Sequence, residues 1–295
     1  MTPLRVHDFG GDGPQLVLLH GYGRSLHDWD FAAPLLAAAG HRVLAVDLPG
    51  HGGSPSISPW TLSTVVEHLA DTLDAHGVPE AVVVGHSLGG IVAVEYARAD
   101  PDRARARAAV DLDGFWWPRD RPGGAQVTEG LLARAGVVAP PGYIEAQVAH
   151  SARSGIPADR AEAAARAAAR PLPDGSRQTL PRREAALELV DELHALGELG
   201  VTAWLGGVER PLYVVQAARR PAPTPGMEWF DEFSARWARE VSDELDALSR
   251  DRPTISVDRI DATHPMILEA PELVAKLVAA FVGGLPPGSG APREA

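Results

Sequence analysis

The sequence predicts an α/β fold, in which a mostly parallel sheet is covered by helices on both faces. Short aliphatic and β-branched runs alternate with stretches whose apolar residues recur at helical spacing. The runs are apolar almost throughout, which is typical of strands buried on both faces. In such a sheet, functional residues gather beyond the carboxyl ends of the strands.

The order of these elements divides the chain into a core, an inserted helical region and a tail. Strands are predicted at 15–19, 42–47, 81–84, 108–113, 211–215 and 254–257. Helical patterns occupy 60–76, 88–99 and 271–282. Residues 115–205 carry no strand signal, and helices are expected at 126–135, 143–153, 158–170 and 182–196. We therefore expect a core formed by 1–114 and 206–285, an inserted helical region at 115–205, and a disordered tail at 286–295, which is rich in proline, glycine and charge.

Composition excludes several classes of function. The 295 residues carry a net charge of −12, which disfavours nucleic acids and anionic membranes as partners. The absence of cysteine excludes disulfides, thiolate catalysis and cysteine–zinc sites. Residues 1–13 show no secretory signal, and no apolar run approaches the roughly 20 residues needed to span a bilayer. We expect a soluble, cytoplasmic protein that acts on a small molecule, and its oligomeric state stays open.

Ser87 is the strongest candidate nucleophile. It stands in the sequence GHSLGG at 85–90, between a predicted strand and a predicted helix. A serine in a tight strand-to-helix turn needs glycine two positions away on each side, because the turn has no room for side chains there. The turn would also place the serine oxygen at a helix N-terminus, where negative charge is stabilised.

A second glycine-rich loop, HGYG at 20–23, follows the first predicted strand. The backbone amides of Tyr22 and Leu88 are the expected pair of donors to a developing oxyanion. His20 is expected to order this loop by hydrogen bonding rather than to take part in chemistry. The sequence DLPGHGGS at 47–54 is expected to be scaffold, with His51 and Ser54 fixing loops.

These motifs, together with THP at 263–265, resemble the ordered signature of the α/β-hydrolase superfamily over residues of about 10–115 and 208–283. The resemblance implies an eight-stranded sheet, a Ser–His–acid triad, no cofactor and no metal. It also implies that 115–205 is a helical cap over the active site. His264, in the loop between the last strand and the terminal helix, occupies the place of the family's general base.

The sequence offers more than one candidate for the acid of the triad. Many superfamily members carry it after the penultimate strand, but the loop at 215–221 contains no Asp or Glu. A minority, including haloalkane dehalogenases and zearalenone-type lactonases, carry it one strand earlier, where this chain has Asp111 and Asp113. Alternation along a strand places both on the same side. We favour Asp113, because it lies at the strand's end, and keep Asp111 and an acid elsewhere as alternatives.

The resemblance and these residues predict a serine hydrolase that cleaves an ester or lactone of a bulky apolar compound. Trp116 and Trp117, directly beyond the acid, are candidate substrate contacts, as are Trp229 and Phe233 on one face of a predicted helix; anchoring the cap is the competing interpretation. Serine in place of aspartate at the nucleophile position argues against dehalogenase and epoxide hydrolase chemistry. An acyl-transfer enzyme or cyclase, and a non-catalytic ligand-binding module, remain alternatives.

Overall fold

A seven-stranded sheet forms the centre of the computed structural model, which describes residues 3–99, 105–223 and 226–286. Its spatial order is β1-β3-β2-β4-β5-β8-β9, and every neighbouring pair except β1–β3 is parallel. The strands are β1 (Val6–Asp8), β2 (Gln15–Leu19), β3 (Arg42–Val46), β4 (Ala81–His86), β5 (Ala106–Leu112), β8 (Leu212–Ala217) and β9 (Ile255–Ile260). The predicted α/β class is confirmed.

The sheet differs from expectation at its edge. Among the described residues, the central sheet has seven strands rather than the eight that the resemblance implied. The antiparallel edge strand β1 has three residues, none of them buried, and so lacks the apolar run by which the other strands were recognised. The predicted tail at 286–295 lies outside the described residues except for Pro286.

Each face of the sheet has its own hydrophobic core. Along β2, Val17 and Leu19 belong to one core, whereas Leu16 and Leu18 belong to the other. This alternation explains why the strands read as continuous apolar runs. One face packs against α2 (Leu62–Ala75), α3 (Leu88–Arg98) and α8 (Val201–Gly206), and the other against α1 (Ala33–Ala38), α10 (Met266–Glu269) and α11 (Pro271–Gly283).

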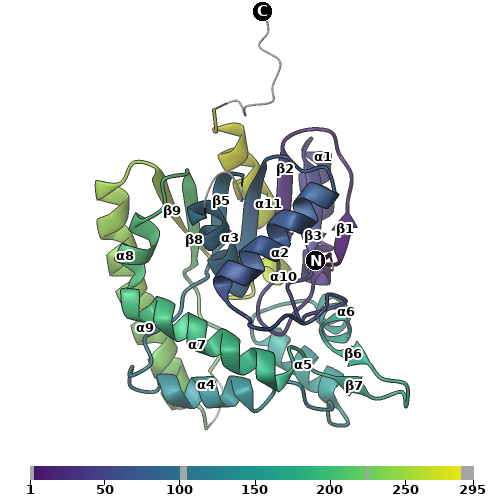
Figure 1. Cartoon of the computed structure of the whole chain (residues 1–295). Coiled ribbons are helices and arrows are strands. Elements are labelled where there is room, and N and C mark those ends of the chain that lie inside the picture. The colour runs from purple at the N-terminus through teal and green to yellow at the C-terminus, as the bar shows by residue number, and fades with distance from the viewer. Residues whose placement is uncertain (1–2, 100–104, 224–225, 287–295) are drawn as a thin grey trace, which may run out of the picture.

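Most of the inserted region lies at the carboxyl end of the sheet, where Figure 1 shows all of its helices but the last below the strands. It comprises α4 (Gly124–Leu132), α5 (Tyr143–Ala152), α6 (Ala158–Ala168) and α7 (Arg183–Leu199), close to the predicted ranges, and α8, which was not predicted. The loops after β2 and β3 meet it, since a side chain at Gly23 or Gly50 would touch Leu180 or Pro181.

Two further elements complete the chain. A small hairpin of β6 (Arg170–Pro171) and β7 (Arg177–Gln178) was not predicted, because two-residue strands carry no periodicity. The long helix α9 (Glu228–Asp251) lies between β8 and β9, and the short 3-10 helix η1 (Leu26–Trp29) follows β2. In the part of the chain that the structure describes, no helix is both long and apolar enough to cross a membrane.

Candidate active site

Ser87 occupies a strained turn between β4 and α3. Its backbone has φ 54° and ψ −120°, a conformation that residues other than glycine rarely adopt. A Cβ on Gly85 would overlap the carbonyl of Gly89, and one on Gly89 would overlap the carbonyl of Leu19. The glycines are therefore required by close backbone approach, as the sequence predicted.

His264 lies directly against Ser87. Its Nε2 is 3.1 Å from the Ser87 hydroxyl oxygen, and its Nδ1 is 2.7 Å from Oδ2 of Asp113. Because a carboxylate only accepts hydrogen bonds, Nδ1 carries the proton and Nε2 accepts from the serine hydroxyl. Half of the His264 side chain is exposed to solvent, at 50%. The three side chains thus form a continuous hydrogen-bonded chain that water can reach.

Asp113 is held just beyond the end of β5. It has a positive φ of 61°, and its second carboxylate oxygen, Oδ1, accepts a hydrogen bond of 3.1 Å from the amide of Ala217. Burial by itself would raise the pKa of Asp113, but the hydrogen bond and electrostatic attraction of His264, with the Ala217 amide, outweigh burial and lower it. Ala217 ends β8, whose following loop carries the acid in many superfamily members.

Asp111 does not contact His264. It lies within β5, fully buried, and its Oδ1 accepts a hydrogen bond of 2.8 Å from the amide of Gly114. The argument from strand alternation does not extend to Asp113, because β5 ends at Leu112 and the positive φ of Asp113 turns the chain. Of the two aspartates that the sequence offered, the structure brings only Asp113 to the histidine.

The loop after β2 approaches the serine closely. A Cβ built on Gly21 would lie 3.3 Å from the Cβ of Ser87. Among the described residues, we find no acceptor for the amide of Tyr22 or of Leu88. Both candidate donors are therefore unused by the protein. The Tyr22 side chain packs against the hydrophobic core and the ring of His51, and burial raises the pKa of its hydroxyl to about 12.

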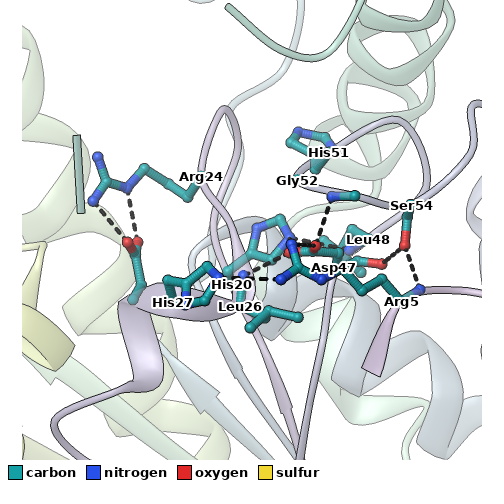
Figure 2. A network of polar contacts seen from close by, with 12 residues as sticks. Arg5, His20, Arg24, Leu26, His27, Asp47, Leu48, His51, Gly52 and Ser54 are labelled. Carbon is teal, nitrogen blue, oxygen red and sulfur yellow. Dashed lines mark hydrogen bonds and ion pairs between the residues drawn. The ribbon is translucent and has the colours of Figure 1, made fainter. Parts of the chain in front are cut away.

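A buried polar network supports this loop, as Figure 2 shows. Oδ1 of Asp47 accepts a hydrogen bond of 2.7 Å from the Leu26 amide, and Oδ2 accepts one of 2.8 Å from the Gly53 amide. His20 donates through Nδ1 to the Gly21 carbonyl, at 2.8 Å, and accepts at Nε2 from the Leu48 amide, at 3.0 Å. These bonds tie the loop after β2 to the loop after β3.

The remaining residues of the second loop are structural as expected. His51 donates through Nδ1 to the carbonyl of Pro49 at 3.1 Å, and the Ser54 hydroxyl donates to the carbonyl of Asp47 at 2.6 Å. Burial, with the adjacent His20, lowers the pKa of His51 to about 3. His20 also has a lowered pKa, mainly because of burial. Both imidazoles are therefore neutral at physiological pH.

His86, the residue before the serine, was not singled out from the sequence. Its Nε2 is 2.7 Å from the backbone carbonyl of His264, and the two imidazole rings lie 5.0 Å apart. Burial, with the nearby His264, lowers the pKa of His86 to about 3. The only signal in the sequence was its place beside Ser87, which gave no indication of its partner 178 residues away.

The candidate substrate contacts are mostly packed against one another. Trp116 and Trp117 stack at 4.1 Å, and Trp117 meets the edge of Phe233 at 5.2 Å. Trp117 and Phe233 are 8% and 5% exposed, so this cluster joins the inserted region to α9. Trp229 instead contacts Phe230. The anchoring interpretation therefore describes Trp117 and Phe233 as they lie in this structure.

A cavity of about 360 Å³ lies between α4 and α7, lined in part by Thr128, Leu132 and His194. None of the residues that line it is Ser87, Asp113 or His264. The Trp116 indole donates a hydrogen bond of 3.3 Å to Nδ1 of His194. Over residues 3–99, 105–223 and 226–286, no cluster of histidine and acidic side chains could hold a metal ion.

Comparisons with curated proteins give partial matches. Bifunctional epoxide hydrolase 2 of Mus musculus is 38% identical over 104 residues, which is 34% of this chain and 19% of that protein. Lipase LipV of Mycobacterium tuberculosis is 42% identical over 119 residues, covering 38% of this chain and 44% of LipV. The chain thus spans about a fifth of the first relative and less than half of the second.

Solved structures and a family model match over most of the chain. E-2-(acetamidomethylene)succinate hydrolase superposes with a TM-score of 0.68 at 22% identity, covering 95% of both chains. The enol-lactonase of Burkholderia xenovorans LB400 gives a TM-score of 0.61 at 18% identity, covering 95% of this chain and 96% of the other. At these identities the likeness shows the fold alone. Because the model of the alpha/beta hydrolase family matches residues 16–277, the chain belongs to that family.

Proposed function

We propose that this chain is a serine hydrolase of carboxylic esters or lactones, with Ser87 as nucleophile, His264 as general base and Asp113 as the orienting acid. The observation that carries the proposal is the chain of two hydrogen bonds, 3.1 Å from serine to histidine and 2.7 Å from histidine to aspartate. Nucleophile, base and orienting acid in this geometry are the arrangement that activates a hydroxyl for acyl transfer.

The first half of the reaction forms an acyl-enzyme. The Ser87 oxygen attacks the carbonyl carbon while His264 Nε2 takes the hydroxyl proton. Asp113 holds the imidazole in the tautomer that leaves Nε2 free to accept, and stabilises the imidazolium that forms. The tetrahedral intermediate then collapses, its bond to the leaving oxygen breaks, and His264 returns the proton to that alkoxide.

The second half consumes water. His264 takes a proton from a water molecule as the water oxygen attacks the acyl carbon. The tetrahedral intermediate then collapses, the bond between the acyl carbon and the Ser87 oxygen breaks, and His264 gives the proton to that oxygen, which releases the acid and restores the serine. The half-exposed His264 supports water rather than a bound alcohol as the acceptor. The two unused amides, of Tyr22 and Leu88, are the proposed donors to the oxyanion in both halves; losing one such donor costs about 10²- to 10³-fold in rate.

We infer that the substrate is a small compound with a bulky apolar acyl part, and that 115–205 acts as a cap over the site. The apolar character of Trp116, which packs at the start of this region three residues after Asp113, supports this inference. The names of a lipase among the relatives and of an esterase and an enol-lactonase among the similar structures agree with ester or lactone chemistry. The chemistry proposed for the triad does not depend on a cofactor.

The proposal is tested by covalent labelling. The purified protein is treated with a small alkyl fluorophosphonate, its mass is measured, and the adduct is located by peptide mapping. We expect one adduct, on Ser87, and none on Ser87→Ala. The same protein should hydrolyse p-nitrophenyl butyrate, with a burst of p-nitrophenol if deacylation is slow.

The outcomes separate the rival functions. A labelled serine without turnover of any simple ester, restored by an added alcohol or amine, would make the chain an acyltransferase. A well-folded protein that the smallest reagent does not label would contradict an activated serine and favour a ligand-binding module. Ser54→Ala is the matched control, since that hydroxyl is buried and bonded within the loop after β3.

A further inference from the structure

The backbone of Asp113 is held in an unfavourable conformation. Within the described part of the chain, Asp113 and Ser87 are the two non-glycine residues with positive φ. Such a conformation is unfavourable for a residue with a side chain and persists when neighbouring groups enforce it. Both residues belong to the proposed triad, so whatever enforces the conformation of Asp113 also aims its carboxylate.

Two hydrogen bonds enforce it, one on each side of the Asp113 Cα. The amide of Asp113 itself donates to the carbonyl of Val215 at 2.9 Å. The next amide along the chain, that of Gly114, donates to the Oδ1 atom of Asp111 at 2.8 Å. Since these amides flank the Cα, holding both of them restricts the two dihedral angles of Asp113.

Asp111 is enclosed by residues that make room for it. A Cβ on Gly90 would overlap Oδ1 of Asp111, and a Cβ on Gly114 would meet the same atom at 2.5 Å. Gly90 is the third glycine of the GHSLGG sequence, and the nucleophile turn itself does not require it. Its absence of a side chain is explained by the Asp111 carboxyl, which lies between the start of α3 and the turn after β5.

We propose that Asp111 is a positioning residue, whose buried carboxyl closes the turn at Gly114 and thereby directs Asp113 toward His264. This inference rests on the proposed function of the triad. Asp111 acts through an acceptor oxygen and not through charge. Burial raises the pKa of Asp111 well above its usual range, and the neighbouring Asp113 adds to this, which favours the uncharged carboxyl.

Two substitutions of Asp111 distinguish a role of its acceptor oxygen from a role of its negative charge. Asp111→Asn keeps the acceptor oxygen and the shape, and is expected to retain the wild-type rate of Ser87 labelling and kcat for p-nitrophenyl butyrate within about threefold. Asp111→Ala removes the acceptor, and kcat is expected to fall by about 10- to 100-fold with KM changed by less than about twofold. The acid limb of the pH–rate profile of Asp111→Ala should also move to lower pH, because a misaligned Asp113 no longer stabilises the imidazolium.

The outcomes distinguish this inference from the proposed function. If the wild type is not labelled at Ser87, the proposed triad is wrong. Wild-type labelling together with a folded Asp111→Ala variant that reacts at the wild-type rate overturns the positioning role. A folded Asp111→Asn variant that loses as much as Asp113→Asn would also overturn it, because charge would then be essential. If Asp111→Ala does not fold, Asp111→Val replaces it, since valine has a similar branched shape and no hydrogen-bond acceptor.

Discussion

His86 donates a hydrogen bond from Nε2 to the backbone carbonyl of His264, at 2.7 Å. A carbonyl only accepts, so the proton of the neutral His86 ring lies on Nε2, and Nδ1 is left as a buried lone pair without a partner among the described residues. The bond links the residue before the nucleophile to the residue proposed as its base. A neutral His86 also avoids placing a positive charge beside the imidazolium that forms on His264.

This contact predicts a graded effect of substitution at position 86. His86→Phe keeps the aromatic ring but loses the donor, and we expect kcat to fall about tenfold with little change in KM, because the His264 backbone is less well held. His86→Gln retains an N–H donor and should recover most of the rate. Both are measured with p-nitrophenyl butyrate and by the rate of Ser87 labelling. Equal rates for wild type and a folded His86→Phe variant would remove the positioning role.

Asp113→Asn tests the identity of the acid. The asparagine side chain carries no negative charge to stabilise the imidazolium, and its NH₂ group can donate to Nδ1 of His264. It therefore favours the tautomer in which Nε2 carries the proton and no longer serves as a base. We expect kcat to fall by about 10³- to 10⁴-fold while the fold is kept. Thermal unfolding and circular dichroism provide the check on folding. A loss of less than about tenfold would place the acid elsewhere.

The residues proposed for the chemistry could be named from the sequence, whereas the contacts that surround them could not. Ser87, His264 and the expected roles of His20 and His51 follow from motifs whose spacing has a local cause, namely a tight turn or a loop hydrogen bond. The sequence favoured Asp113 as the acid because it lies at the strand's end, but kept Asp111 and an acid elsewhere as alternatives, because the direction of the Asp113 side chain depends on the dihedral angle of one residue after the strand ends.

Contacts between segments far apart in the chain could not be predicted from a single sequence. The bond from His86 to His264 and the amide of Ala217 on Asp113 join segments more than 100 residues apart. The aromatic residues illustrate the same limit. Their helical spacing predicted a common face, but only packing shows that Phe233 is covered by Trp117. Short strands such as β1 and β6 were missed because two or three residues carry too little pattern.

Buried neutral histidines predict how stability depends on pH. The pKa of His51 is lowered to about 3 in the folded protein, mainly by burial, whereas a histidine in the unfolded chain titrates near its usual pKa of 6.5. Between these values the unfolded chain binds a proton that the folded one does not, so the free energy of unfolding decreases as the pH falls. For one such group the loss is about 1.4 kcal/mol between about pH 7.5 and 5.5.

His51→Gln should therefore reduce this pH dependence. Glutamine can still donate to the Pro49 carbonyl, and it does not titrate. Urea unfolding at both pH values should show that the variant loses about 1 kcal/mol less than the wild type on acidification, whatever its stability at neutral pH. His7→Gln, at an exposed position, serves as the control and should leave the dependence unchanged. An unaltered slope in His51→Gln would mean that His51 is charged in the folded state.

Arg121 joins the start of the inserted region to α9. Its side chain is 8% exposed and forms two hydrogen bonds with Glu240, of 2.5 and 2.9 Å. The guanidinium also lies over the ring of Trp237, 4.6 Å from its centroid, and 5.6 Å from that of Phe233. The helix between β8 and β9 thus supports the region proposed as the cap, although it lies outside residues 115–205.

Arg121→Met should lower the free energy of unfolding by about 2 kcal/mol, because the cation–π contacts and the paired hydrogen bonds are lost together. Glu240→Gln should cost less than about 1 kcal/mol, because the Glu240 side chain is 45% exposed and is rehydrated when the pair is weakened. Arg119→Met is the matched control: its ion pair with Asp191 is exposed on both sides, and its loss should change stability by less than about 0.5 kcal/mol. If Arg121→Met lowers the free energy of unfolding no more than Arg119→Met does, the contact with α9 does not hold the inserted region in place.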